Sequence, residues 1–415
     1  MDRLVIDDLE LSGKRVLTRV DFNVPLADGR VSDDTRIGAA LPTIRKIVSA
    51  GGKLILMSHL GRPKGEAAEK FSLQPVATAL SEALDKDIEI APDCVGDAVA
   101  KMVEKLEDGE ILLLENTRFH KEETANDAEF SAQLAALGDV YVNDAFGTAH
   151  RAHASTVGVT KHIKECAAGY LLQTEVENLT KLIADTEKPY VVILGGAKIS
   201  DKLKVIHNLV TKVSSILVGG GMAYTFLKAK GLEVGDSLLD DGRLELAYNT
   251  MVVADNPHPY KRFDFILPLD HVVANSSNDS QFEINERPEI TSGWKGVDIG
   301  PKTVAAFKEK IMAAKSIFWN GPMGIFENDD FAKGTIEIAL SVAKATEQGA
   351  FSVVGGGDSI AAIAKAGVTD KISHVSTGGG ASLEFMAGID LPGIMALSKV
   401  KKKPAPAKEV AAAES

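Results

Sequence analysis

Short runs of apolar residues alternate with longer segments of helical periodicity along most of this 415-residue chain. Ten apolar runs predict strands, at 15–22, 53–59, 110–116, 140–146, 190–196, 215–221, 263–269, 316–322, 351–357 and 374–380. Apolar residues at helical spacing predict helices over 35–50, 72–84, 201–212, 302–314 and 333–347. Because strands buried on both faces read as near-continuous apolar runs, this alternation predicts an α/β protein with parallel sheets covered by helices.

The number of strands and a long helical segment near the middle indicate two domains. Ten strands are many for one open sheet, and 415 residues exceed what one hydrophobic core usually serves. We therefore predict two doubly wound, Rossmann-like domains, at 1–167 and 187–390, joined by a helix and hinge at 168–186. An ordinary crossover helix in one large sheet stays open as the alternative for 168–186. The Lys-, Pro- and Ala-rich end, 399–415, offers little for a core and is predicted to be disordered.

Composition and charge narrow the class of protein. The net charge of −12 disfavours nucleic acid or an anionic membrane as a partner, although a local basic pocket can still bind a small anion. The two cysteines, Cys94 and Cys166, have no metal-ligand spacing around them, so neither a disulfide framework nor a zinc site is indicated. Residues 1–10 contain no apolar secretion signal, and no apolar run approaches the ~20 residues of a membrane span. We expect a cytoplasmic enzyme or binding protein.

Basic residues follow the predicted strands of the N-terminal half. In open α/β sheets, ligands bind beyond the carboxyl ends of the strands, and arginine forks suit phosphate or carboxylate. The side chains in these positions are Asp21, Asn23, Arg36, His59, Arg62, Arg118, His150, Arg151 and His153. Any one arginine alone is better explained as a surface ion pair, but several at matching positions predict an anion site.

Glycines, in contrast, follow the strands of the C-terminal half. They stand at 195–196, 219–221, 355–357 and 378–380. Because missing side chains let backbone N–H groups approach a phosphate or a flat base, four such turns predict a bound nucleotide. A single glycine triplet would indicate only a tight turn.

Charged residues near these glycines have two explanations each. Lys198 and Lys202 flank a predicted helix start, where a cation without an anion costs about 0.3–1 kcal/mol. They either extend into solvent or bind a phosphate. Asp358 is either a helix N-cap or a carboxylate that holds Mg²⁺ with substrate phosphates, and we favour the metal. Glu327 is either a surface carboxylate or a partner for ribose hydroxyls.

Several other enzyme classes lack their motifs in this chain. The P-loop pattern G-x-x-x-x-G-K-[ST] and the dinucleotide pattern G-x-G-x-x-G are absent. Residues 357–361, GDSIA, miss the G-x-S-x-G elbow at the last position. His150 and His153 have no third metal ligand nearby in the sequence. A hydrolase or a metalloenzyme is therefore set aside, and a dehydrogenase is disfavoured.

Nine segments, in order along the chain, resemble those of the phosphoglycerate kinase family. They read RVDFNVP, SHLGRP, ENTRF, FGTAHRAHAS, LGGAKISDK, GGGMAYTF, WNGPMGIFE, VGGGDS and STGGGASLE. With LPGI at 391–394, the resemblance covers residues 15–393. Ser359 departs from the threonine of many members but keeps the hydroxyl, and 399–415 extends beyond the usual end.

The resemblance implies two domains facing each other across a substrate cleft. The N-terminal domain would bind 3-phosphoglycerate or 1,3-bisphosphoglycerate, the C-terminal domain MgADP or MgATP, and 391–398 would return to the N-terminal domain. The implied glycerate-binding residues are Asp21, Asn23, Arg36, His59, Arg62, Arg118 and Arg151. The implied nucleotide-binding residues are Lys202, Gly219, Gly220, Gly221, Glu327, Gly356, Gly357, Asp358 and Ser359, with Asp358 on the metal. The implied catalytic residues are Arg36, Lys198, Gly356 and Gly379.

The implied reaction is reversible, Mg²⁺-dependent phosphoryl transfer from 1,3-bisphosphoglycerate to ADP. It would proceed in line after domain closure and would be carried out by a cytoplasmic monomer. A catalytically inactive nucleotide-binding protein with the same fold is the leading alternative, although every charged position that the mechanism needs is present.

Overall fold

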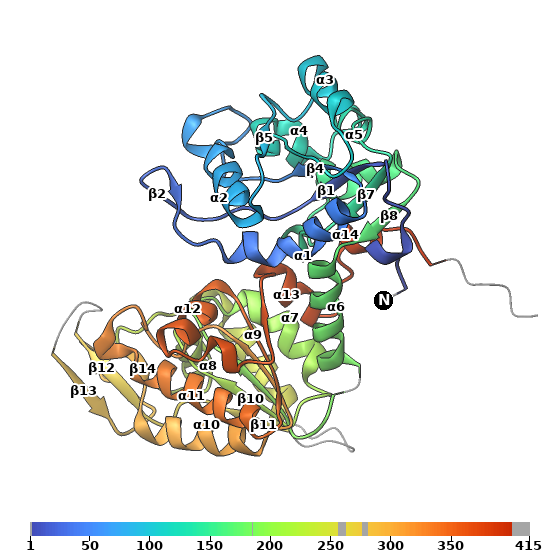
Figure 1. The fold of residues 1–415 in the computed structure, drawn as a ribbon. Helices are drawn as coiled ribbons and strands as arrows, with labels where there is room; N and C mark the ends of the chain where they lie inside the picture. Colours follow the sequence, from blue (N-terminus) through green and yellow to red (C-terminus); the bar gives the residue numbers. More distant parts are fainter. Residues whose placement is uncertain (1, 185, 256–262, 276–280, 401–415) are drawn as a thin grey trace, which may run out of the picture. The chain divides into compact units, whose positions relative to one another are not determined.

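The computed structural model describes residues 2–184, 186–255, 263–275 and 281–400, and it divides into two compact units (Figure 1). Unit 1 contains residues 2–144, 153–170 and 396–400. Unit 2 contains residues 145–152 and the described residues of 171–395. Residues 145–152 thus cluster with unit 2, whereas the predicted first domain ran without interruption to 167. The 401–415 part of the tail that we expect to be disordered lies outside the described residues.

Unit 1 is built on a six-stranded parallel sheet with the order β5-β6-β4-β1-β7-β8. Its strands are β1 (Arg15–Arg19), β4 (Lys53–Met57), β5 (Glu89–Ile90), β6 (Ile111–Leu113), β7 (Val140–Asn143) and β8 (Cys166–Ala168). Its helices are α1 (Thr35–Ser49), α2 (Gln74–Leu84), α3 (Asp97–Lys105), α4 (Lys121–Ala125) and α5 (Ala128–Ala135). A short hairpin of β2 (Leu26–Ala27) and β3 (Arg30–Val31) precedes α1, and the 3₁₀ turn η3 (Thr117–Phe119) follows β6.

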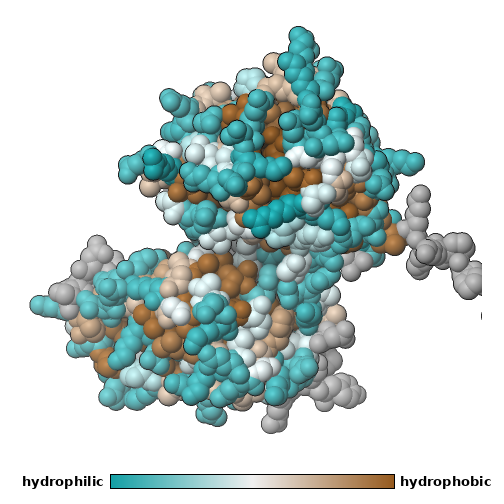
Figure 2. All heavy atoms as spheres, in the orientation of Figure 1, coloured by the Kyte–Doolittle hydropathy of each residue, from teal (hydrophilic) through white to brown (hydrophobic). Residues whose placement is uncertain are grey.

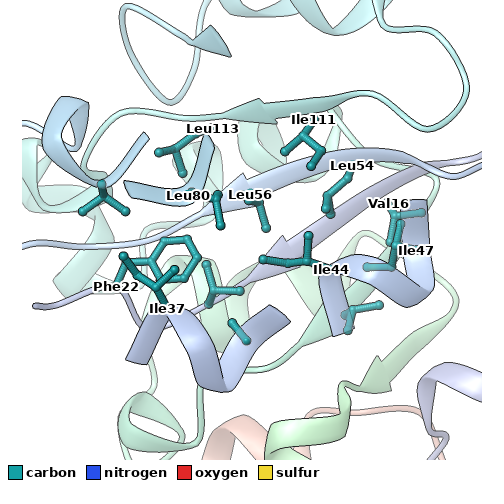
Figure 3. Packing of buried hydrophobic residues seen from close by; sticks show 14 of the residues in the cluster. Val16, Phe22, Ile37, Ile44, Ile47, Leu54, Leu56, Leu80, Ile111 and Leu113 are labelled. Carbon is teal, nitrogen blue, oxygen red and sulfur yellow. The ribbon is translucent and has the colours of Figure 1, made fainter. Parts of the chain in front are cut away.

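One face of the unit 1 sheet packs against α1 and α2. Ile37, Ile44 and Ile47 fall on one side of α1 because they are spaced seven and three residues apart, and all three are buried. Figure 3 shows Ile44 beside Leu54 and Ile47 beside Val16. Burial of each such side chain stabilises the fold by about 1.5–3 kcal/mol. In Figure 1, α3 and α5 lie on the opposite side of the sheet, so the sheet is covered on both faces.

Unit 2 is built on a second six-stranded parallel sheet, with the order β11-β10-β9-β15-β16-β17. Its strands are β9 (Tyr190–Leu194), β10 (Ser215–Val218), β11 (Asp264–Ile266), β15 (Ser316–Asn320), β16 (Phe351–Gly355) and β17 (His374–Ser376). Its helices are α6 (Tyr170–Ile183), whose first residue belongs to unit 1, α7 (Ser200–Leu209), α8 (Met222–Ala229), α9 (Leu244–Asp255), α10 (Pro301–Ala313), α11 (Lys333–Glu347), α12 (Gly357–Lys365), α13 (Gly380–Met386) and α14 (Pro392–Met395). Side chains of α10, α11 and α12 share one core with alternate residues of β9, β15 and β16.

The ten predicted strands are all present, and each ends before its predicted end. The reason is that most of the polar residues and glycines at the end of each apolar run do not pair with a neighbouring strand. They form the loop that follows it. A three-stranded antiparallel sheet, with the order β13-β12-β14, was not predicted. It comprises β12 (His271–Ala274), β13 (Phe282–Asn285) and β14 (Lys295–Ile299). Three residues of β13 are exposed, so the strand lacks the continuous apolar run that marked the others.

The segment near residue 398 returns to the start of the chain within unit 1. The Leu4 backbone N–H donates to the Ser398 carbonyl at 2.8 Å, and the Ser398 N–H donates to the Cys166 carbonyl at 2.9 Å. The buried Arg3 guanidinium donates to the Leu397 carbonyl at 2.9 Å. These bonds agree with the expected return of 391–398 for its last residues, 396–398, which belong to unit 1.

Hydrophilic and hydrophobic residues are mixed over the face that Figure 2 shows. Among the described residues, no helix has both the length and the apolar character that a membrane crossing requires.

Asp298 at the end of β14 gives unit 2 a pH dependence that can be measured. Burial raises the pKa of Asp298 from its usual 3.8 to about 7, against the effect of N–H groups of Gly334 and Ile299 that donate to it. Between about pH 4 and pH 7 the unfolded chain loses this proton while the folded chain keeps it. The free energy of unfolding therefore falls by up to about 1.4 kcal/mol per pH unit as pH rises.

We expect Asp298→Asn to flatten this slope in urea unfolding between about pH 5 and pH 7, because the amide keeps an acceptor and has no proton to lose. Exposed Asp370→Asn is the matched control and should leave the slope as it is. An Asp298→Asn slope equal to that of the unmodified chain would contradict the assignment.

Candidate functional site: a basic cluster and a glycine-lined cavity

Asp21, Asn23 and Arg36 form a hydrogen-bonded group beyond the carboxyl end of β1. Arg36 Nη1 donates to Asp21 Oδ2 at 2.8 Å, and the Asn23 N–H donates to Asp21 Oδ1 at 3.2 Å. Asn23 Oδ1 in turn accepts from the Gly61 N–H at 2.8 Å, which joins this group to the loop after β4. The Arg36 side chain is 36% exposed, so its guanidinium is held in place and remains accessible to a ligand.

His59 lies under this group and is neutral. Its Nδ1 is 3.1 Å from Nη2 of Arg19, and because a guanidinium can only donate, Nδ1 accepts and the ring proton is on Nε2. Burial, followed by the charge of Arg19, lowers the pKa of His59 well below its ordinary 6.5. Arg19 is fully buried and donates to Ser155 Oγ at 2.8 Å, and Ser155 donates to the buried carboxylate of Glu123 at 2.6 Å.

Arg62 and Arg118 complete the unit 1 group. The buried Arg118 donates from Nη1 to the Gly61 carbonyl at 2.9 Å, and its backbone N–H is capped by Asn116 Oδ1 at 3.0 Å. Arg62, the next residue after Gly61, is exposed. The loop after β4 and the turn η3 therefore carry both arginines to the region of Asn23.

Arg151 belongs to unit 2, so unit 1 by itself brings together six of the seven predicted glycerate-binding residues. Its Nε donates to Nε2 of His150 at 3.1 Å, which fixes His150 Nε2 as an acceptor. His150 Nε2 lies within 3.6 Å of the position that a Cβ on Gly380 would take. Arg151 is therefore placed near the start of α13 within its own unit.

A cavity of about 390 Å³ lies at the carboxyl ends of β9, β15 and β16. Its lining consists of Gly196, Ala197, Lys198, Lys202, Asn320, Gly321, Gly356, Gly357, Asp358, Ser359, Gly379, Gly380 and Leu383. The N-terminus of α12, which runs for nine residues from Gly357, opens at this lining. Free N–H groups and the helix dipole there favour an anion.

Two glycines in this region have conformations that a side chain would disturb. Gly356 has φ +92°, and a Cβ there would lie 2.9 Å from Asn320 Nδ2. Gly220 has φ +64°, and a Cβ there would lie 2.5 Å from the backbone N of Gly196. The triplet 219–221 therefore packs directly against the loop after β9.

The two lysines differ in burial. Lys202, in the first turn of α7, is only 9% exposed, and Nζ lies 3.6 Å from the Cβ position of Gly196. Lys198, two residues before α7, is exposed. Both lysines line the cavity. This position favours the phosphate-binding explanation over the one in which the side chains extend into solvent.

The remaining predicted nucleotide ligands lie in different places. Asp358 is exposed in the first turn of α12 and lines the cavity. Glu327 is exposed and, like Gly219, Gly220 and Gly221, is not among the described residues that line it. Gly220 donates to the Met323 carbonyl at 2.9 Å, which places the triplet beside the loop after β15.

Sequence reasoning missed Asn320 and Gly321 as part of the lining. Asn320 Nδ2 donates to the Gly355 carbonyl at 2.8 Å and ties the ends of β15 and β16 together. The signal was present, because Asn320 ends the apolar strand β15 and Gly321 follows it. Arg19 was also missed, since an arginine within a buried strand looks like an edge residue until its partners are known.

Ser359 supports the lining by accepting from the Gly321 N–H at 2.6 Å. Because Ser359 is fully buried, Ser359→Ala would leave that N–H without its partner. We expect about a tenfold rise in the Kd of a nucleotide, the ligand that the glycine turns predict for this cavity, equivalent to ~1.4 kcal/mol and measured by calorimetric titration. Ser359→Thr keeps the hydroxyl and should stay within about twofold of the unmodified chain.

The matched control is Ser341→Ala, since Ser341 is also buried and its hydroxyl donates to the Glu337 carbonyl within its own helix. It should leave the Kd unchanged. A threonine variant as impaired as the alanine variant would show that space, and not the hydroxyl, decides the effect.

One α/β unit carries clustered arginines, and the other has a glycine-lined cavity that Lys198 and Lys202 border. These features fit a phosphotransferase better than a hydrolase or a dehydrogenase. The phosphoglycerate kinase family model matches residues 6–389. Phosphoglycerate kinase of Chloroherpeton thalassium is 53% identical over 399 residues, which is 96% of this chain and 100% of that protein. Phosphoglycerate kinase of Thermosipho africanus is 51% identical over 404 residues, 97% and 99% of the two chains.

Solved structures give the same result. The phosphoglycerate kinase of Coxiella burnetii superposes with a TM-score of 0.84 at 41% identity and covers 95% of this chain and 98% of its own. That of Pyrococcus horikoshii OT3 superposes with a TM-score of 0.81 at 34% identity and the same coverage. The chain belongs to the phosphoglycerate kinase family. It transfers a phosphoryl group between 1,3-bisphosphoglycerate and ADP, giving 3-phosphoglycerate and ATP, which is a step of glycolysis.

Proposed function

We propose that unit 1 holds the phosphoglycerate substrate and unit 2 holds the nucleotide. The observation that supports the nucleotide assignment most strongly is the cavity in which Lys198 and Lys202 meet the N-terminus of α12. The nucleotide phosphates would bind Lys202 and the N–H groups of Gly356 and Gly357, with Ser359 holding Gly321 behind them. Gly219, Gly220 and Gly221 would border the adenine, and Glu327 would bind the ribose.

The glycerate substrate would bind the unit 1 cations. Arg36, Arg62 and Arg118 supply charge, Asp21 and Asn23 hold Arg36 and the Gly61 loop, and His59 donates its Nε2–H. Arg151 would add a further cation. Because His59 is neutral, it can orient the substrate without adding charge that would change near neutral pH.

The transfer step would depend on positioning and charge neutralisation. The acceptor is a carboxylate that is already ionised, so no general base is needed. Arg36 and Lys198 would neutralise the equatorial oxygens of the phosphoryl group, and the backbone N–H groups of Gly356 and Gly379 would donate to it. The attacking and leaving oxygens would lie in line.

Mg²⁺ would bind with the nucleotide. Asp358 is a single exposed carboxylate at the edge of the cavity, and Mg²⁺ in proteins is commonly held by one or two carboxylates plus substrate phosphates. The donor set therefore fits this ion. When bound, Mg²⁺ would neutralise phosphate charge, while the cavity N–H groups and Lys202 orient the phosphates.

We propose that the two units close on their ligands before transfer, since the ligands would bind to separate units. We expect both substrates together to lower the radius of gyration measured by small-angle scattering, because reacting oxygens must come within ~3–3.5 Å of each other. Each ligand alone is the control. An unchanged radius of gyration with both ligands would contradict closure.

A coupled assay tests the proposed activity and its metal requirement together. Monomeric, cytoplasmic enzyme should phosphorylate 3-phosphoglycerate with ATP and should stop when Mg²⁺ is chelated. Turnover without any divalent ion would contradict the role of Asp358, and absence of turnover with Mg²⁺ would favour an inactive nucleotide-binding protein. Light scattering after size exclusion tests the monomeric state.

A further inference from the structure

A second group of potential ligands lies in unit 1, and none of its members belongs to the arginine cluster, although His120 is only two residues from Arg118. Asp93, Cys94 and His120 each offer one atom, and these three atoms lie within 4.8 Å of one another. Asp93 and Cys94 follow β5, and His120 follows η3 after β6. Since β5 and β6 are parallel neighbours, their carboxyl ends bring these residues to the same edge of the sheet.

We propose that Asp93, Cys94 and His120 form a binding site for a divalent transition metal, best suited to Zn²⁺. A carboxylate oxygen, a thiolate sulfur and an imidazole nitrogen form a donor set that zinc accepts, whereas Mg²⁺ and Ca²⁺ prefer oxygen alone. Binding would release the thiol proton to solvent.

The three side chains are held by their surroundings. Asp93 Oδ1 accepts from the Cys94 N–H at 2.6 Å and lies 2.7 Å from His120 Nε2. The His120 ring stacks on Phe130 with 5.0 Å between centroids, which fixes its plane. Without metal, the Asp93–His120 contact is a hydrogen bond. A metal ion with bonds of ~2.0–2.3 Å would take the place of the proton between Asp93 Oδ1 and His120 Nε2, the ring proton would then be on Nδ1, and the two atoms would separate slightly.

A cavity adjoins the cluster and would leave one coordination position open. It has a volume of about 400 Å³, and Asp93 and His120 line it together with Glu69 and Glu115. No lysine or arginine is among the described residues of this lining, so its charge favours a cation. Cys94 is fully buried behind Asp93, so the thiolate would bind from the protein side and a water from the cavity side.

The sequence did not reveal this site because the ligands are 26 residues apart and only Asp93 and Cys94 are adjacent. A zinc pattern in sequence needs two closely spaced pairs. Here the parallel sheet supplies the proximity.

Calorimetric titration of Zn²⁺ into the full, chelator-treated chain tests the proposal. We expect one Zn²⁺ per chain, with affinity at least about tenfold weaker in Cys94→Ser and in His120→Gln. Cys166→Ser is the matched control, since Cys166 is equally buried but bonds to the Ile163 carbonyl, and it should bind as the unmodified chain does. Excess Mg²⁺ should not displace the zinc.

Co²⁺ supplies a spectroscopic signature that a folding defect alone would not produce. The thiolate-to-cobalt charge-transfer band should appear in the unmodified chain, in Cys166→Ser and weakly in His120→Gln, and should be absent from Cys94→Ser. Circular dichroism confirms that each variant is folded. Unchanged zinc affinity in both site variants, no stoichiometric binding, or a band that persists in Cys94→Ser would overturn the proposal.

Discussion

Lys198→Ala should lower kcat by about 10²–10³ while the Kd for ADP changes much less. Lys198 lines the cavity but is exposed, whereas Lys202 is buried against the Gly196 loop. The exposed lysine is therefore the one free to follow a phosphoryl group in transfer. An interaction made mainly in the transition state affects kcat and leaves ground-state binding largely intact.

Lys204→Ala is the matched control, because Lys204 is exposed on α7, six residues after Lys198, and does not belong to the cavity lining. It should retain the unmodified kcat. Equal loss of ADP affinity and kcat in Lys198→Ala would assign Lys198 to ground-state binding, and a near-normal kcat would remove its role in transfer.

Arg36→Ala should lower kcat/KM for 3-phosphoglycerate by about 10²–10³. The change removes a cation and also leaves Asp21 without the guanidinium that lies 2.8 Å from its carboxylate. The carboxylate of Asp21, which has then lost its cationic partner, repels an anionic substrate. Steady-state kinetics with 3-phosphoglycerate as the varied substrate measures kcat/KM.

The control is Arg45→Ala on the same helix, where the guanidinium donates to the Ala83 carbonyl at 3.4 Å. It should leave kcat/KM unchanged. Arg36→Lys should recover only part of the activity, since a point charge cannot replace a planar fork. Equal effects of Arg36→Ala and Arg45→Ala would show a general loss of positive charge.

Ten of the twelve parallel strands in the described residues were predictable because both sheets are buried on both faces, whereas the short strands β5 and β8 were not predicted. A strand such as β9 then reads as an unbroken apolar run, and the residues just beyond it face ligands. That rule predicts the positions of Asn23, His59 and Gly356 beyond the ends of strands. The roles of individual residues came from the family resemblance and remain predictions.

Other features depend on tertiary context and leave little trace in the sequence. The exposed strand β13 has no apolar run. The buried Arg19 is tolerated because Ser155 links it to Glu123, and both of these partners lie more than 100 positions from Arg19 in the chain. Residues 145–152 pack with unit 2 through contacts such as Phe146 on Phe385, 6.3 Å between centroids. Contacts across such separations are not encoded in local periodicity.

Calorimetric titration of both substrates into two variants tests the division of labour between the units most directly. We expect Lys202→Ala to weaken ADP binding and to leave 3-phosphoglycerate binding unchanged. Arg36→Ala should do the reverse, because the two side chains belong to separate ligand groups in separate units. Loss of both affinities in either folded variant, or loss of the opposite affinity, would contradict the assignment of phosphoglycerate to unit 1 and nucleotide to unit 2.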